Sequence, residues 1–123
     1  MLVLLVEDQL DVLEYLRLYF TERGYEAVTA CTAEEAVKRL DEFIPDIAFV
    51  DLILPRGHGR TVLQEMVKRD LPTRKVVLTA CDDLRLRREL LELGVTDYLF
   101  KPVTIRDLDL LLNPESDPIL DSD

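Results

Sequence analysis

Short apolar runs alternate five times with amphipathic helical patterns, and this alternation restricts the fold more than any other feature of the sequence. The runs at residues 2–6 and 47–50 contain no polar residue, which is typical of strands buried on both faces. Alternating strands and helices indicate a parallel sheet joined by right-handed crossovers, with helices on both faces. We therefore predict an α/β flavodoxin-like (βα)5 three-layer sandwich, with five parallel strands in the order 2-1-3-4-5.

Turn and capping residues set the expected boundaries of these elements. The predicted strands cover residues 2–6, 25–29, 47–51, 75–78 and 97–100. The expected N-caps of the helices are Asp8, then Thr32 in a capping box with Glu35, then Asp82 or Asp83, and finally Thr104. The third helix is expected to bury Val62, Leu63, Met66 and Val67.

Length and charge limit the kind of protein this chain can be. With 123 residues, we expect one domain at residues 1–112 and an acidic, proline-containing tail or linker at residues 113–123. The net charge of −10 repels nucleic acid phosphates, so direct nucleic acid binding is not expected. No apolar run approaches membrane-spanning length, and the isolated Cys31 and Cys81 suggest a reduced, cytoplasmic protein. His58 is interpreted as a solvated loop residue.

Polar side chains follow four of the predicted strands at the points where these strands end. Glu7 and Asp8 follow the first, Asp51 ends the third, Thr79 follows the fourth and Lys101 follows the fifth. The carboxyl ends of parallel strands share one edge, and the switch point of the 2-1-3-4-5 order lies between strands one and three. We therefore expect these side chains to meet in one site.

Three carboxylates crowded at one edge repel each other, by about 4 kcal/mol per pair at 4 Å and an effective dielectric near 20. Such a cluster must raise a pKa or bind a cation, and hard oxygen ligands partly open to water suit Mg²⁺. A carboxylate can also act as a nucleophile and form an aspartyl phosphate. The oxygens of a phosphoryl group on Asp51 could then be neutralised by Mg²⁺, by the Lys101 ammonium and by the Thr79 hydroxyl with nearby backbone N–H groups.

The ordered motifs resemble the receiver domain of two-component response regulators over residues 2–112. They are the apolar strand with Glu7-Asp8, the segment from Asp51 to Pro55 with Gly59, Thr79-Ala80, and Tyr98-Leu-Phe-Lys101-Pro102. The resemblance implies a signalling switch domain rather than an enzyme. A histidine kinase, a phosphotransfer protein or a small phosphodonor would supply the phosphoryl group.

The resemblance also assigns roles to single residues. Asp51 would be the phosphoacceptor. Glu7, Asp8, Asp51 and the backbone carbonyl of Ile53 would bind Mg²⁺, with Mn²⁺ as a substitute. Thr79, Ala80 and Lys101 would contact the phosphoryl group, Tyr98 would be an aromatic switch, and the Lys101–Pro102 peptide bond would be cis.

Phosphorylation would change the surface of helix four, strand five and helix five, through which the chain would pair with a second copy or bind an output partner. An output domain could also belong to a longer regulator.

Ile53 and Cys81 occupy the positions that tune water attack on the acyl phosphate in this family. Ile53 can neither orient nor activate water, so we expect a long-lived phosphoryl group.

Three other functions compete with this interpretation. A pseudo-receiver or scaffold would bind partners without phosphorylation, but the complete set of site residues argues against it. A Mg²⁺-dependent phosphohydrolase of the haloacid dehalogenase type would need a second acid where Ile53 stands. A flavin- or nucleotide-binding module would need a phosphate-binding loop where Glu7 and Asp8 stand.

Overall fold

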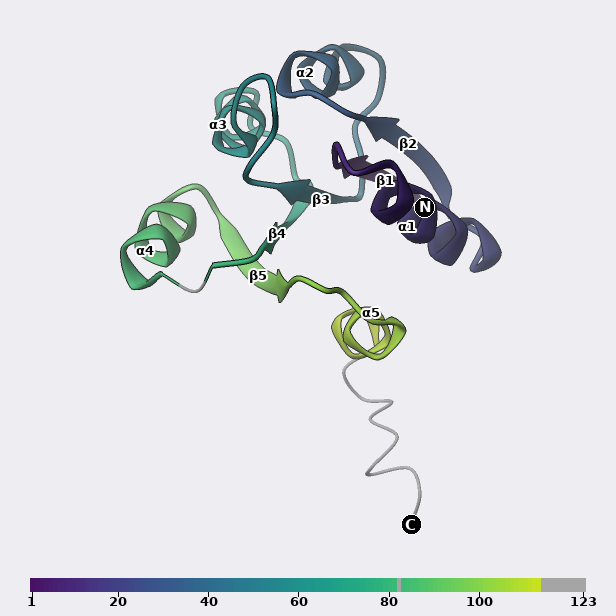
Figure 1. Ribbon diagram of the computed structural model, residues 1–123. Coiled ribbons are helices and arrows are strands. Elements are labelled where there is room, and N and C mark those ends of the chain that lie inside the picture. Colours follow the sequence, from purple (N-terminus) through teal and green to yellow (C-terminus); the bar gives the residue numbers. More distant parts are fainter. Residues whose placement is uncertain (82, 114–123) are drawn as a thin grey trace.

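The computed structural model of the chain describes residues 1–81 and 83–113, so the expected tail lies almost entirely outside the described residues. A single parallel sheet is formed by β1 (Leu2–Val6), β2 (Glu26–Ala30), β3 (Ile47–Asp51), β4 (Arg74–Thr79) and β5 (Val95–Phe100). The strand order is β2-β1-β3-β4-β5, which confirms the predicted flavodoxin-like topology (Figure 1).

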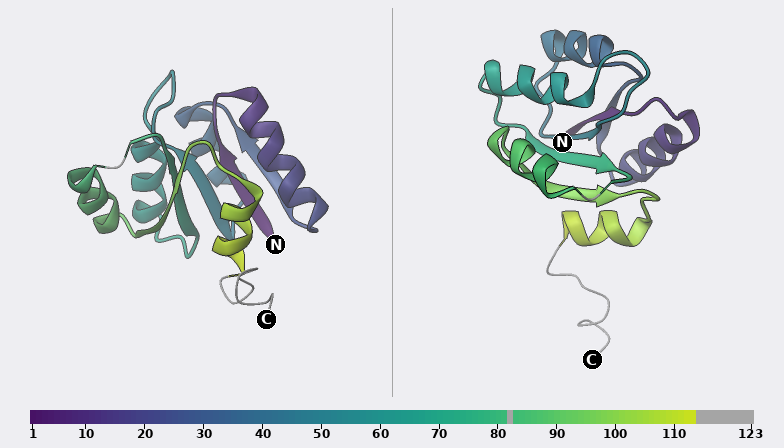
Figure 2. Two further views of the ribbon diagram at one scale, coloured as in Figure 1. Left: turned by 60° about the horizontal axis from the view of Figure 1, so that its bottom comes forward. Right: turned by 60° about the vertical axis from the view of Figure 1, so that its left-hand side comes forward.

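Helices cover both faces of the sheet (Figures 1 and 2). On one face, α1 (Leu10–Glu22) and α5 (Ile105–Leu112) enclose a core centred on Phe20 and Phe49. On the other, α2 (Ala33–Glu42), α3 (Gly59–Lys68) and α4 (Leu84–Glu92) enclose a second core. Every residue of β3 is buried, because β3 lies at the centre of the sheet between the two cores. None of the helices in the described part of the chain combines the length and apolar character needed to cross a bilayer.

The helix caps agree with the sequence at three of the five N-termini. Asp83 and Thr104 cap α4 and α5, and Thr104 forms a full capping box with Asp107. Thr32 caps α2, but the Glu35 carboxylate accepts from the backbone N–H of Cys31 instead of closing the box.

Two further expectations about helices were wrong. Gln9, not Asp8, occupies the N-cap of α1, because the turn after β1 takes up both acids before the helix begins. Val67 is 46% exposed, because it lies about 100° around the helix from the buried Met66. The partly buried Leu71, beyond the end of α3, packs against this core instead.

The start of α3 lies against the end of β3. A Cβ atom added to Gly59 would lie 2.2 Å from the backbone oxygen of Asp51 and 2.8 Å from the Cα of Leu52. The N–H of Gly59 donates to the carbonyl of Leu52 at 2.8 Å. Glycine is therefore required here for close approach of two backbones, and this contact fixes the chain directly after Asp51.

Candidate functional site

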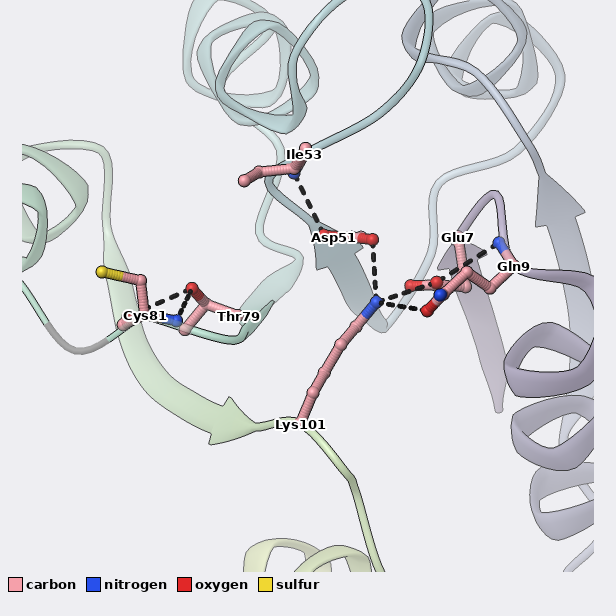
Figure 3. Close-up of polar contacts among 7 residues, drawn as sticks. All are labelled: Glu7, Gln9, Asp51, Ile53, Thr79, Cys81 and Lys101. Carbon is pink, nitrogen blue, oxygen red and sulfur yellow. Dashed lines mark hydrogen bonds and ion pairs between the residues drawn. The ribbon is translucent and has the colours of Figure 1, made fainter.

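Three strand ends bring one lysine and two acids together at the carboxyl edge of the sheet. The Lys101 Nζ lies 2.9 Å from Glu7 Oε1 and 2.9 Å from Asp51 Oδ2 (Figure 3). It also donates to the side-chain oxygen of Gln9 at 3.2 Å. The sequence placed Glu7, Asp51 and Lys101 at one edge, and the structure shows that they are in direct contact.

Burial dominates the electrostatics of this cluster. Glu7 has no exposed surface and Asp51 is 6% exposed. Burial raises the pKa of Glu7 from 4.5 to about 7, although the Lys101 hydrogen bond opposes the shift, and the charge of Asp51 adds to it. Burial alone would lower the pKa of Lys101, but its bonds to Glu7 and Asp51 outweigh that effect and raise it.

The donor set fits a small hard cation. Glu7, Asp8 and Asp51 each offer a carboxylate oxygen, and these oxygens lie within 4.8 Å of one another. Among the described residues, Glu7 Oε2 is buried without a hydrogen-bond partner. Buried carboxylate oxygens are costly unless paired, and Mg²⁺ is held by one or two carboxylates together with waters. A Mg²⁺ ion at this cluster would satisfy the unpartnered oxygen of Glu7.

An open cavity of about 300 Å³ lies over Asp51. Its lining consists of Asp8, Gln9, Asp51, Ile53, Thr79, Ala80 and Lys101. The backbone N–H of Ile53 donates to Asp51 Oδ1 at 3.0 Å, and the Ile53 side chain is 76% exposed. One carboxylate oxygen of Asp51 is thus held by a backbone N–H and the other by Lys101, which fixes the orientation of the carboxylate.

Thr79 lines the cavity, but its hydroxyl is engaged elsewhere. The hydroxyl donates to the carbonyl of Cys81 at 3.1 Å and accepts from the N–H of Cys81 at 3.0 Å. Figure 3 shows this turn to one side of the contacts between Lys101 and Asp51. For the Thr79 hydroxyl to donate to a group on Asp51, its hydrogen bond to the Cys81 carbonyl has to break.

Tyr98 lies on the α4 side of β5, outside the cavity. Its hydroxyl donates to the carbonyl of Arg87 at 3.1 Å, and the Arg87 guanidinium lies 5.1 Å from the centre of its ring. Tyr98 therefore connects β5 to α4. The Lys101–Pro102 peptide bond is cis, the isomer that the resemblance implied.

Sequence reasoning missed two polar contacts. Gln9 belongs to the site through Lys101, and its only sequence signal is its position directly after Glu7 and Asp8. His58 is exposed, as expected, but it also caps α3 by accepting from the N–H of Arg60 at 3.0 Å. It remains outside the cavity.

Comparison with known proteins gives a consistent result. The family model described as "Response regulator receiver domain" matches residues 3–113. The response regulator SaeR of Staphylococcus aureus is 32% identical over 111 residues, which cover 90% of this chain and 48% of SaeR. A ycf27 protein of Guillardia theta is 34% identical over 107 residues, which cover 87% of this chain and 42% of that protein. The chain thus spans less than half the length of these curated relatives.

Solved structures share the whole fold. A CheY-like response regulator receiver domain protein from Methanospirillum hungatei has a TM-score of 0.83 and 25% identity, with 99% of this chain and 98% of that chain covered. The receiver domain of the Francisella response regulator 1452 has a TM-score of 0.81 and 25% identity, with 96% of this chain and 98% of that chain covered.

Proposed function

This chain belongs to the response regulator receiver domain family, and from that premise we propose that Asp51 accepts a phosphoryl group in a Mg²⁺-dependent reaction. The observation that carries the proposal is the contact of one lysine with two buried acids at the edge of the sheet. Such a cluster keeps a nucleophilic carboxylate, a compensating cation and an unpartnered metal-type ligand together at one edge of the sheet.

The chemical step is transfer from a phosphohistidine of a histidine kinase or phosphotransfer protein, or from a small phosphodonor. With phosphohistidine, an oxygen of Asp51 attacks phosphorus, a P–O bond forms, and the P–N bond breaks with its electron pair passing to the imidazole. With acetyl phosphate, the P–O bond to the acetyl group breaks instead and acetate leaves. Lys101 then pairs with a phosphoryl oxygen in place of the Asp51 oxygen that it contacts in the structure. The N–H of Ile53 holds the carboxylate in the orientation from which it attacks.

Glu7, Asp8 and Asp51 are the residues that would hold Mg²⁺, together with the backbone carbonyl of Ile53. The ion, when bound, would neutralise phosphoryl charge that Lys101 alone cannot compensate. With the ion bound, Glu7 would be held as a carboxylate against the effect of burial, because a cation favours the charged form.

We propose that phosphorylation is transmitted to the surface of α4, β5 and α5. Thr79 would leave Cys81 for the phosphoryl group, and Tyr98 would then occupy the space that Thr79 vacates. Tyr98 moving inward would break its bond to the carbonyl of Arg87 and release α4. An output partner, an attached output domain or a second copy of the chain would recognise the changed surface.

Intact mass spectrometry tests the phosphorylation step. The protein is incubated with Mg²⁺ and acetyl phosphate or phosphoramidate. We expect one added phosphoryl group, blocked by chelator and absent in Asp51→Asn. Asp70→Asn is a matched control, because Asp70 is exposed and its positive φ of 53° suits asparagine. No gain with any donor would contradict the proposal and favour a phosphorylation-independent pseudo-receiver. Release of inorganic phosphate from phosphomonoesters would instead indicate a phosphohydrolase.

A further inference from the structure

We propose that Gln9 is a positioning residue, which holds the Lys101 ammonium in place for phosphoryl transfer. This inference rests on the function proposed above. An ammonium has three N–H donors, and the structure places three acceptors around Lys101 Nζ, on Glu7, Asp51 and Gln9 (Figure 3). Gln9 is the one uncharged group among them.

The neutral amide matters because the other two acceptors have further tasks. Glu7 and Asp51 belong to the carboxylate cluster that fits a cation, and Asp51 is also the proposed nucleophile. When those oxygens bind a metal or attack phosphorus, their hydrogen bonds to Lys101 weaken. The Gln9 oxygen competes with neither task, since Mg²⁺ in protein sites prefers carboxylates and phosphate oxygens. Gln9 would therefore keep Lys101 at the site throughout the reaction.

The first turn of α1 gives a second, independent observation. Gln9 occupies the N-cap of α1, where its side chain makes no capping hydrogen bond. In the described part of the chain, the other four helices are capped by a side chain, from Thr32, His58, Asp83 and Thr104. Serine, threonine, aspartate or asparagine would cap α1 better. The longer Gln9 side chain leaves the helix uncapped and reaches Lys101 instead.

The backbone of Gln9 also belongs to this arrangement. Its N–H donates to Glu7 Oε1 at 3.3 Å, the same oxygen that accepts from Lys101. The side chain lines the cavity over Asp51 together with Lys101. Gln9 thus contacts both Glu7 and Lys101 while remaining outside the carboxylate cluster.

Phosphorylation kinetics give the first test. Gln9→Met keeps the length of the side chain but removes the acceptor. We expect it to lower the maximal rate with acetyl phosphate by about five-fold, and to change the half-saturating donor concentration and the Mg²⁺ affinity by less than about two-fold. Gln64→Met is the matched control, because Gln64 is exposed on α3. A Gln9→Met rate equal to that of Gln64→Met would overturn the proposal.

Trace labelling with acetic anhydride gives a second test that needs no phosphorylation. Labelling of Lys101 is measured by mass spectrometry relative to Lys38, whose side chain is 73% exposed. We expect Gln9→Met to raise the relative labelling about three-fold, because an ammonium held by two acceptors instead of three is more mobile and more accessible to the reagent, while Gln9→Glu keeps it low. Equal labelling in wild type and Gln9→Met would refute the role of Gln9. Failure of the wild type to gain phosphate would count against the proposed function alone.

Discussion

Glu7 is the residue whose chemistry depends most on its surroundings. It follows a buried strand, has no exposed surface, and shares one oxygen with Lys101 while the other has no hydrogen-bond partner among the described residues. An acid in this position is costly to ionise, and the pKa of about 7 expresses that cost. Without a metal ion, Glu7 is therefore a source of instability that depends on pH.

We predict that the metal-free protein loses stability as the pH rises from about 4.5 to 7. The folded state raises the pKa of Glu7, so over this interval it holds a proton that the unfolded state has released. The shift corresponds to roughly 3 kcal/mol of unfolding free energy. Urea unfolding in chelator at pH 5 and pH 8 measures it.

Glu7→Gln should remove this contribution, and Glu22→Gln, on the exposed end of α1, should retain it. Titration of Lys101 does not interfere, because its pKa is raised from an already high value and lies above this window. A Glu7→Gln protein whose stability falls between pH 5 and pH 8 as steeply as the wild type would show that the effect arises elsewhere.

Ile53 gives a prediction about the lifetime of the phosphoryl group. Its side chain is 76% exposed at the mouth of the cavity and offers no group that could orient water. We expect Ile53→Asn to accelerate loss of phosphate by about ten-fold, because an amide can position the attacking water. Decay is followed by intact mass after removal of the donor. Ile44→Asn, at another exposed isoleucine (63%), is the control, and equal decay of both variants would contradict the prediction.

At the scale of whole elements, the contact between α3 and β3 fixes the backbone on which Asp51 lies. Gly59 allows the first turn of α3 to lie against the backbone of Asp51 and Leu52. We predict that Gly59→Ala destabilises the protein by about 3 kcal/mol, because rigid backbone atoms cannot yield to a Cβ. Gly24→Ala should cost only about 1 kcal/mol, from its positive φ alone. Thermal unfolding of both compares the two effects, and equal losses would argue against the close contact.

The attachment of α4 gives a second prediction about an element. Leu90 is the one buried residue of α4. Polar contacts also attach this helix, because Glu89 pairs with Arg60 at 2.6 Å and the Tyr98 hydroxyl donates to the carbonyl of Arg87. We expect Tyr98→Ala to leave phosphorylation intact but to reduce, at least about two-fold, the change in α4 hydrogen exchange on phosphorylation. Tyr15→Ala, at a partly exposed tyrosine of α1, is the control. An undiminished response of α4 would remove Tyr98 from the switch.

Considered over the whole molecule, the sequence predicts the fold better than the detail of the site. Strand order follows from alternation and crossover handedness, and the meeting of Glu7, Asp51 and Lys101 follows from strand polarity. The bond from Gln9 to Lys101 and the engagement of Thr79 with Cys81 depend on side-chain rotamers, which periodicity does not specify. The sequence also does not show why Gly59 is needed, because glycine is favoured both in turns and where two backbones approach closely.

A prediction for the whole molecule concerns metal binding. A net charge of −10 and three converging carboxylates should make the fold more stable when Mg²⁺ binds. At a Mg²⁺ concentration of one hundred times Kd, the unfolding free energy should rise by about 2.7 kcal/mol. Thermal unfolding at constant ionic strength measures this increase, and Asp8→Asn should reduce it. An equal increase with Na⁺ alone, or in Asp8→Asn, would point to general screening of charge.

The wide sequence separation between the partners of Lys101 has a consequence for the protein during its synthesis. Lys101 lies 94 residues from Glu7 and 50 residues from Asp51, so the acids leave the ribosome long before their cation. A nascent chain that ends before β5 has the acids of the site but not the ammonium that contacts them in the folded structure. The phosphorylation proposed for Asp51 would therefore begin only after residue 101 has been synthesised, and chains truncated before it would compete poorly for the phosphodonor.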